Sequence, residues 1–288
     1  MRDYIILTDS CCDLPAGMAE ELGLEVMPMV FTIEDKDYRN YADGRDMAPH
    51  VFYEKLRAGA MGSTAALNVG EFQEKMEELI GRGLDILYIS FSSGLSTTYQ
   101  SACIAAKDVL EEHPDARIEV VDSRAASLGQ GLLVYLAAQE KAKGKSLEEV
   151  RDFVEATKRH ICHWFTVDDL NHLKRGGRVS AAAALVGTML QMKPVLHVDD
   201  EGHLIPMSKV RGRKASIKAL LDKMEELQTD TSVVFISHGD CLQEAQELGE
   251  MIRAKFPVEK LVIGDIGPVI GNHSGPGTMA LFFQGKNK

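Results

Sequence analysis

The segment LDILYISF (residues 84–91), followed by SSGLSTTY (residues 92–99), carries the clearest structural signal in this chain of 288 residues. Its first part is an apolar run rich in Ile and Leu, which is typical of a strand buried in a parallel sheet. Five hydroxyl side chains follow within residues 92–98, and residues 99–110 then place apolar side chains at helical spacing. Strand, polar loop and helix in this order predict an α/β fold.

The same alternation continues on both sides of this segment. Apolar runs predict further strands at Tyr4–Leu7, Glu25–Phe31 and Ile118–Val121. Helical patterns lie between or after these runs, at residues 70–82 and Leu128–Lys143. Because strands and helices alternate, we expect a parallel sheet that helices cover on both faces.

The pattern changes in the second half of the chain, after a helix that begins with the capping-box pair Ser146 and Glu149. The stretch Val195–Lys209 predicts a β-hairpin with its turn at residues 200–202. The elements expected after it are a helix at residues 217–227, strand Ser232–Ile236, helix Leu242–Phe256, strand Lys260–Ile266 and strand Thr278–Phe283. We therefore expect two α/β domains, a parallel-sheet domain at residues 1–159 and a mixed-sheet domain at residues 160–288.

Composition excludes several classes of protein. The chain has 32 Lys and Arg against 43 Asp and Glu, a net charge of -11, so neither nucleic acid nor an anionic membrane is expected as its main partner. No window approaches the roughly 20 apolar residues of a spanning helix, so no stable membrane insertion is expected. The N-terminus does not resemble a signal peptide, and five scattered cysteines suit reduced thiols, which predicts a cytoplasmic protein.

Polar loops after the predicted strands are the best candidates for a ligand site. In an open α/β sheet, ligands bind at the carboxyl ends of the strands, where hydroxyls and helix N-termini converge. The loop at residues 92–98 has more hydroxyls than helix capping requires, although capping alone is the alternative. A second candidate is His273, which Gly275-Pro276-Gly277 would hold in a rigid loop; the alternative is a turn with an exposed His. Thr64 lies in a third small polar loop.

Two clusters of basic residues stand out in this acidic chain. Arg175 and Arg178 flank a Gly-Gly pair, and Arg211 precedes Gly212 in a second cluster. Arg beside Gly suits an anionic group or an acidic partner, whereas a solvated surface is the plainer interpretation. The chain has no P-loop, dinucleotide fingerprint or nucleophile elbow, and His160, Cys162 and His163 lack a second ligand pair at zinc spacing. No metal and no cofactor are expected.

Several motifs in order along the chain resemble the DegV family of bacterial fatty-acid-binding proteins. The motifs are TDSCCDLP (residues 8–15), Thr64, SSGLSTTY (residues 92–99), LKRGGR (residues 173–178), residues 209–214 and HSGPG (residues 273–277). The chain departs from the family pattern at Thr97, where Gly is usual, and at residues 64–67, where Thr-Ser-Gln-Pro is usual.

The resemblance implies two α/β domains with one long-chain fatty acid buried between them. The carboxylate would be held by hydroxyls of Thr64 and of Ser92 or Ser93, and by His273, with Arg211 as a further ligand. In some members the protein hands its fatty acid to a separate fatty acid kinase, which phosphorylates the carboxyl group for phospholipid synthesis. Arg175, Arg178 and Arg211 are then candidates for contact with the kinase or with phosphate.

Elementary energetics agree with such a ligand. A buried carboxylate needs several convergent hydrogen-bond donors. A sixteen-carbon tail at about 0.8 kcal/mol per methylene gives on the order of 12 kcal/mol before ordering costs. Residues 179–192 offer small and flexible apolar side chains for a tail tunnel, including Ala182, Leu185 and Met189, although an ordinary amphipathic helix is the alternative.

Two other functions remain open at this point. The first is a small serine esterase or acyltransferase that uses Ser93 as nucleophile and His273 as base, without a visible third group. The second is a binder of phosphosugar-type ligands that uses the same Ser loops. The second would need a polar pocket, which the Ala-rich and Met-containing residues 179–192 do not favour.

Overall fold

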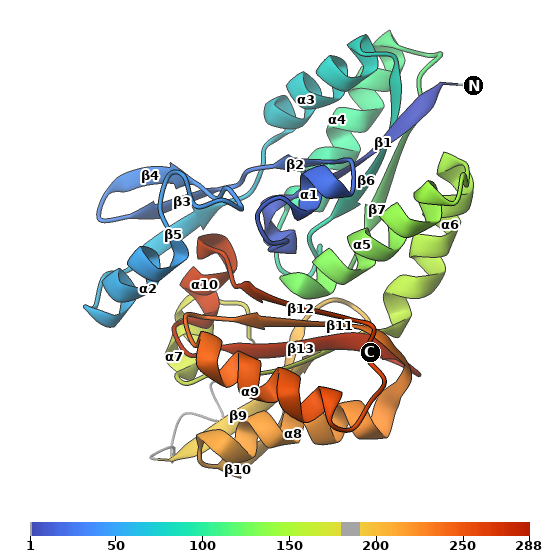
Figure 1. Cartoon of the computed structure of the whole chain (residues 1–288). Coiled ribbons are helices and arrows are strands. Elements are labelled where there is room, and N and C mark those ends of the chain that lie inside the picture. Colours follow the sequence, from blue (N-terminus) through green and yellow to red (C-terminus); the bar gives the residue numbers. More distant parts are fainter. Residues whose placement is uncertain (1, 180–190) are drawn as a thin grey trace.

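The computed structural model describes residues 2–179 and 191–288, which form three sheets with helices around them (Figure 1). The strands are β1 (Asp3–Asp9), β2 (Leu24–Met27), β3 (Val30–Ile33), β4 (Lys36–Arg39), β5 (Gly62–Ala65), β6 (Leu84–Ser90), β7 (Ile118–Asp122), β8 (Ile161–Thr166), β9 (Met192–Val198), β10 (Leu204–Arg211), β11 (Gln228–His238), β12 (Lys260–Asp265) and β13 (Met279–Gly285). The helices are α1 (Met18–Glu21), α2 (Pro49–Arg57), α3 (Val69–Gly81), α4 (Thr98–Glu112), α5 (Leu128–Ala142), α6 (Leu147–Thr157), α7 (Leu170–Arg175), α8 (Arg213–Leu227), α9 (Leu242–Arg253) and α10 (Pro268–Ser274), with 3₁₀ turns η1 (Ser10–Cys12) and η2 (Lys158–His160).

The N-terminal sheet is parallel, with strand order β2-β1-β6-β7, and this confirms the predicted fold class. Its strands alternate between two hydrophobic cores. Leu7 and Tyr88 pack with side chains of α3 and α4, whereas Ile6 and Leu87 pack with side chains of α5 and α6. Helices therefore cover both faces, as the alternation of strands and helices predicted.

The C-terminal sheet is mixed, with strand order β10-β9-β8-β13-β11-β12. The predicted hairpin is present as β9 and β10, and α8 and α9 cover one face of the sheet. Helix α5 contacts the opposite face at β8, β11 and β13 and also contacts β1 and β6, so it lies between the two sheets. Strand β8 begins at Ile161; the predicted domain boundary between residues 159 and 160 stays a prediction.

Some predicted elements were wrong. The strand expected at Glu25–Phe31 is two strands in different sheets, because Pro28 lacks the N–H that would continue the ladder. Its second half, β3, pairs with β4 and β5 in a three-stranded antiparallel sheet. The rigid loop expected around His273 begins only after Ser274, since His273 itself lies in the last turn of α10.

The sequence patterns did not predict strand β8 or helices α2 and α10. Strand β8 is buried on both faces, so it shows no alternation, and it contains the polar His163. Helix α10 is only seven residues long and includes Gly271 and Asn272, which are poor helix formers. Across the residues that the structure describes, no helix combines the length and the apolar character that a membrane crossing requires.

Candidate ligand-binding site

A cavity of about 490 Å³ lies between the loops of the parallel sheet and the inner face of the mixed sheet. Its volume falls within the about 300–1,000 Å³ of small-molecule pockets. The described residues that line it from the N-terminal half are Met29, Thr64, Ala65, Ala66, Phe91, Ser93, Leu95, Ser96, Thr97, Gln100, Ala126 and Ser127. Those from the C-terminal half are His163, Phe165, Leu173, Arg178, Val198, Leu204, Ile266, Val269, Ile270, His273, Ser274, Thr278, Ala280 and Phe282.

The walls of the cavity are mainly apolar because one face of the mixed sheet turns toward it. Phe165 of β8 lies opposite Ala280 of β13 in the antiparallel register, and Phe282 follows two residues further along the same face. All three are buried. These side chains form a hydrophobic surface that suits an aliphatic ligand.

One end of the cavity is polar, and two segments that are distant in the sequence meet there. Thr64 Oγ1 on β5 lies 2.9 Å from His273 Nε2 on α10. The neighbouring Asn272 donates from Nδ2 to the backbone oxygen of Gly62 at 3.0 Å, which fastens β5 to α10. Gly176 leaves room for the imidazole, since a Cβ at that position would overlap His273 Nδ1. We call Thr64, His273 and Ser274 the cavity pole.

Unpaired polar atoms characterise the cavity pole. Burial, followed by the nearby charge of Arg178, lowers the pKa of His273 to about 4, so the imidazole is neutral at pH 7. His273 Nδ1 and Ser274 Oγ are buried and have no hydrogen-bond partner among the described residues. A neutral imidazole and two hydroxyls can hydrogen-bond an anionic group but do not themselves balance its charge.

Arg178 supplies positive charge next to the cavity pole. Its guanidinium donates from Nε to the backbone oxygen of Leu95 at 3.3 Å and also donates to the backbone oxygen of Gly176. Arg178 lines the cavity and, together with Thr64 and His273, also lines a second hollow of about 350 Å³. Arg175, which is exposed, lies in the wall of that second hollow only.

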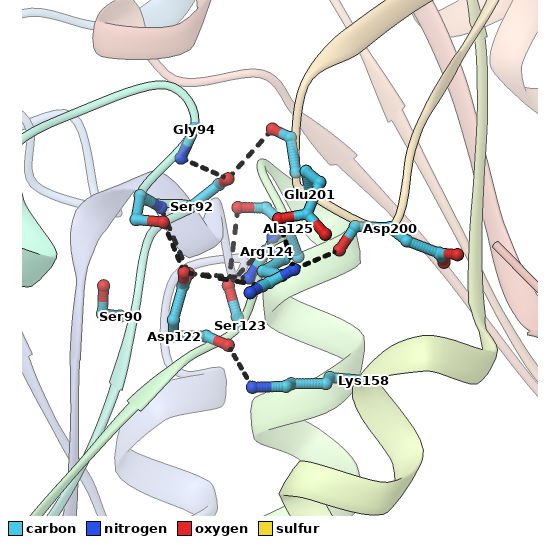
Figure 2. A network of polar contacts seen from close by, with 12 residues as sticks. Ser90, Ser92, Gly94, Asp122, Ser123, Arg124, Ala125, Lys158, Asp200 and Glu201 are labelled. Carbon is cyan, nitrogen blue, oxygen red and sulfur yellow. Dashed lines mark hydrogen bonds and ion pairs between the residues drawn. The ribbon is translucent and has the colours of Figure 1, made fainter.

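The two serines expected as ligands have different surroundings. Ser93 lines the cavity, and its hydroxyl donates to Asp122 Oδ2 at 2.5 Å while its N–H donates to Oδ1 at 3.1 Å. Ser92 is fully buried and donates to the backbone oxygen of Gly202 at 2.9 Å (Figure 2). Of the two, only Ser93 reaches the cavity wall among the described lining residues.

Asp122 belongs to a polar network that ties the two sheets together, shown in Figure 2. Arg124 donates to the backbone oxygen of Asp200 at 2.7 Å and pairs with Glu201 at 2.9 Å, both in the β9–β10 turn. Lys158 Nζ donates to the backbone oxygen of Asp122 at 3.0 Å. We call the contacts among Ser92, Ser93, Asp122, Arg124, Lys158 and residues 200–202 the turn network.

Other predicted site residues lie elsewhere. Arg211 is exposed at the end of β10, where it donates to Gln191 Oε1 at 3.0 Å, and it is not among the described lining residues of the cavity. The tail-tunnel residues expected at 182, 185 and 189 (Ala182, Leu185 and Met189) fall outside the described residues. The hydrogen bond between Ser93 and His273 that a hydrolase would need is not present, because Ser93 pairs with Asp122 and His273 with Thr64.

Sequence patterns missed several lining residues. Phe165 and Phe282 carry no signal that separates a cavity wall from an ordinary core strand. Ser274 was passed over beside His273, although a hydroxyl next to a candidate ligand could have been noted. Ser127, which lines the cavity at the start of α5, has no neighbouring motif that points to it.

Proteins of one family match this chain over nearly its whole length. The family model described as an uncharacterised protein of the DegV family matches residues 4–286. A DegV domain-containing protein of Clostridium perfringens is 47% identical over 290 residues, covering 100% of this chain and 99% of the relative. A solved DegV family structure from Thermus thermophilus, whose description is of fatty acid binding, has a TM-score of 0.88 and 31% identity, covering 99% of this chain and 100% of that one. DegV of Bacillus subtilis, described as a fatty acid binding protein, has a TM-score of 0.85 and 29% identity, with 99% and 100% covered.

Proposed function

Since this chain belongs to the DegV family, we propose that it binds one long-chain fatty acid in the cavity between its two sheets. The carboxylate lies at the cavity pole, against Thr64 and His273, and Ser93, which lines the same cavity, is a further donor. The aliphatic tail lies along the apolar wall that includes Phe165 and Phe282. The fatty acid binding described for the Thermus thermophilus and Bacillus subtilis relatives supports this assignment.

The observation that carries the proposal is the pairing of an apolar wall with a polar end whose buried atoms lack partners. A buried carboxylate is costly unless donors surround it. Thr64 and His273 supply such donors, and Arg178 supplies the positive charge that the neutral imidazole does not. His273 Nδ1 and Ser274 Oγ, which have no partner among the described residues, would gain one when the carboxylate binds.

Native mass spectrometry of the protein as purified tests the proposal. We expect a mass increment equal to one acyl chain, and the same fatty acid after lipid extraction. A ligand-free spectrum, together with no uptake when oleic or palmitic acid is titrated, would refute the proposal. Covalent labelling of Ser93 by a fluorophosphonate probe would instead favour the hydrolase alternative.

We further propose that the protein presents the bound carboxylate to a separate kinase. A carboxylate oxygen would attack the γ-phosphorus of ATP, forming a P–O bond while the bond to the departing ADP breaks, which gives an acyl phosphate. The second hollow supports this idea, because it shares Thr64, Arg178 and His273 with the cavity and adds Arg175. Positive charge there suits the phosphate groups of a reacting complex.

Arg175→Ala separates presentation from binding. Arg175 does not line the cavity, so fatty acid affinity should stay at the wild-type value. With a candidate kinase and ATP, acyl phosphate trapped by hydroxylamine should form more slowly. An unchanged rate would remove Arg175 from the proposed contact, whereas a parallel loss of affinity would mean that the residue acts on the cavity itself.

A further inference from the structure

His163 is a polar side chain in the apolar part of the cavity. It lies on β8 two residues before Phe165 and faces Phe282 of β13, whose ring centroid is 5.4 Å away in an edge-on arrangement. The side chain is only 1% exposed, and neither ring nitrogen has a hydrogen-bond partner among the described residues. Burial keeps the pKa of His163 well below its usual value, so the ring is a neutral imidazole with one donor and one acceptor.

Two other polar side chains that line the cavity, Ser127 and Thr278, have partners within the protein, whereas His163 has none among the described residues. The Ser127 hydroxyl donates to Asp13 Oδ2 at 2.6 Å, and the Thr278 hydroxyl donates to the backbone oxygen of Ser274 at 2.9 Å. The ring of His163 is accommodated at α5 by Gly129, where a Cβ would overlap Nε2. Leaving a buried donor and acceptor unpaired is unfavourable. The surroundings are therefore shaped for this imidazole without supplying it a partner.

The position of His163 along the cavity determines which part of a bound tail could contact it. Thr278 lies beside the cavity pole, because its hydroxyl contacts the backbone of Ser274 and Gly275. Phe282, the register partner of His163, is four residues further along, or roughly 13 Å at about 3.3 Å per residue. An extended hydrocarbon chain advances roughly 1.25 Å per carbon, given C–C bonds of about 1.52 Å and angles of about 111°. For a tail that extends along β13 from the cavity pole, His163 therefore lies about ten carbons from the carboxyl end.

We propose that His163 makes the cavity selective for acyl chains that carry a hydroxyl group near the middle of the tail. The hydroxyl would accept from, or donate to, the imidazole and so satisfy a nitrogen that an unsubstituted tail leaves unpaired. This inference rests on the proposed fatty acid function and adds the class of tail to it. A hydroxyl near the carboxyl end would not reach His163 and should bring no preference.

Competition binding with delipidated protein tests the inference, using stearic, 10-hydroxystearic and 3-hydroxystearic acids as ligands. In the wild-type protein, the affinity ratio of 10-hydroxystearic to stearic acid should exceed the same ratio in His163→Leu by about tenfold, or about 1.4 kcal/mol. His163→Gln, which keeps a donor and an acceptor, should retain most of the preference. Phe165→Leu, a control in the same wall, should weaken both acids equally.

The outcomes separate the inference from the function on which it rests. If no acid binds to the wild-type protein, the proposed function fails. If the acids bind and the ratio is the same in the wild-type protein and His163→Leu, the inference alone is overturned. Should His163→Leu fail to fold, the wild-type comparison decides: equal affinities for 10-hydroxystearic and 3-hydroxystearic acid would overturn the inference, and a preference for the 10-hydroxy isomer would support it.

Discussion

The turn network and the cavity pole are both polar clusters where the first half of the chain meets the C-terminal half, yet they differ in whether their polar atoms have partners. In the turn network, Ser92, Asp122 and Arg124 each have partners within hydrogen-bond distance. At the cavity pole, His273 Nδ1 and Ser274 Oγ have none among the described residues. Satisfied polar groups hold a structure together, whereas unsatisfied ones beside a cavity are candidates for contact with a ligand. We therefore expect substitutions in the first region to affect mainly stability and those in the second mainly binding, with Ser93, which belongs to the turn network and lines the cavity, as the exception.

Gly202→Ala should have the largest effect, by breaking the turn network. Gly202 has a φ of +83°, and a Cβ there would overlap the Ser92 hydroxyl and lie 3.1 Å from Cα of Arg124. We expect a loss of about 3 kcal/mol in the free energy of unfolding, measured by urea denaturation. Gly177→Ala is the matched control, because Gly177 has a φ of +66° and open space around it, and should cost about 1 kcal/mol. Equal losses in the two variants would contradict the steric argument.

His273→Leu should reduce fatty acid affinity more than stability, because it removes a hydrogen-bonding group from the cavity pole. Hydrogen bonds to a charged group contribute about 1.5–3 kcal/mol, so fatty acid affinity should fall about thirtyfold, or about 2 kcal/mol. The free energy of unfolding of the ligand-free protein at pH 8 should fall by only about 1 kcal/mol, because the variant loses the hydrogen bond between Nε2 and Thr64 Oγ1 but no partner of Nδ1 among the described residues. Displacement of a fluorescent fatty acid measures the affinity. Wild-type affinity would exclude His273 from the site.

The same variant should alter how stability depends on pH. The pKa of His273 is lowered to about 4 in the folded protein, whereas it is about 6.5 in the unfolded chain. Below pH 6.5 the unfolded chain therefore binds a proton that the folded protein does not, and stability falls until about pH 4. His273→Leu should lose about 1 kcal/mol less stability than wild type between pH 8 and pH 5.5. Urea denaturation at the two pH values measures this difference. An equal loss of stability in the wild-type protein and in His273→Leu would contradict a neutral, buried His273.

The sequence predicted the sheets better than it predicted the contacts between them. Strand β6 was recognisable because a strand buried on both faces is a continuous apolar run. Strand β8 is equally buried, but His163 interrupts its apolar pattern, so the centre of the mixed sheet was missed. Helix α10 is too short and too rich in poor helix formers for a periodic signal.

The contacts within the candidate site were even harder to predict from the sequence. Thr64 and His273 are 209 positions apart, and no spacing rule connects residues that only the packing of two domains brings together. Their association came from a resemblance of motifs and not from the pattern of residues. Local pattern also cannot separate Ser92 from Ser93, since both belong to one polar loop. Only the position of the β9–β10 turn, which engages Ser92, distinguishes the two.

Substituting these two adjacent serines in turn gives the finest test of the comparison, with the smallest expected effects. Ser92→Ala removes the donor to Gly202 and the acceptor for the Gly94 N–H, so it should cost about 1 kcal/mol of stability and leave fatty acid affinity unchanged. Ser93 belongs to the turn network but also lines the cavity, so its hydroxyl could donate to a bound carboxylate in place of Asp122. Ser93→Ala should therefore weaken binding about fivefold, or about 1 kcal/mol. Asp122 would keep its contacts with the backbone N–H groups of Ser93 and Arg124, which limits the loss of stability. If Ser92→Ala were the variant that lost affinity, the carboxylate would have to reach behind the cavity wall, and the division between the turn network and the cavity pole would be wrong.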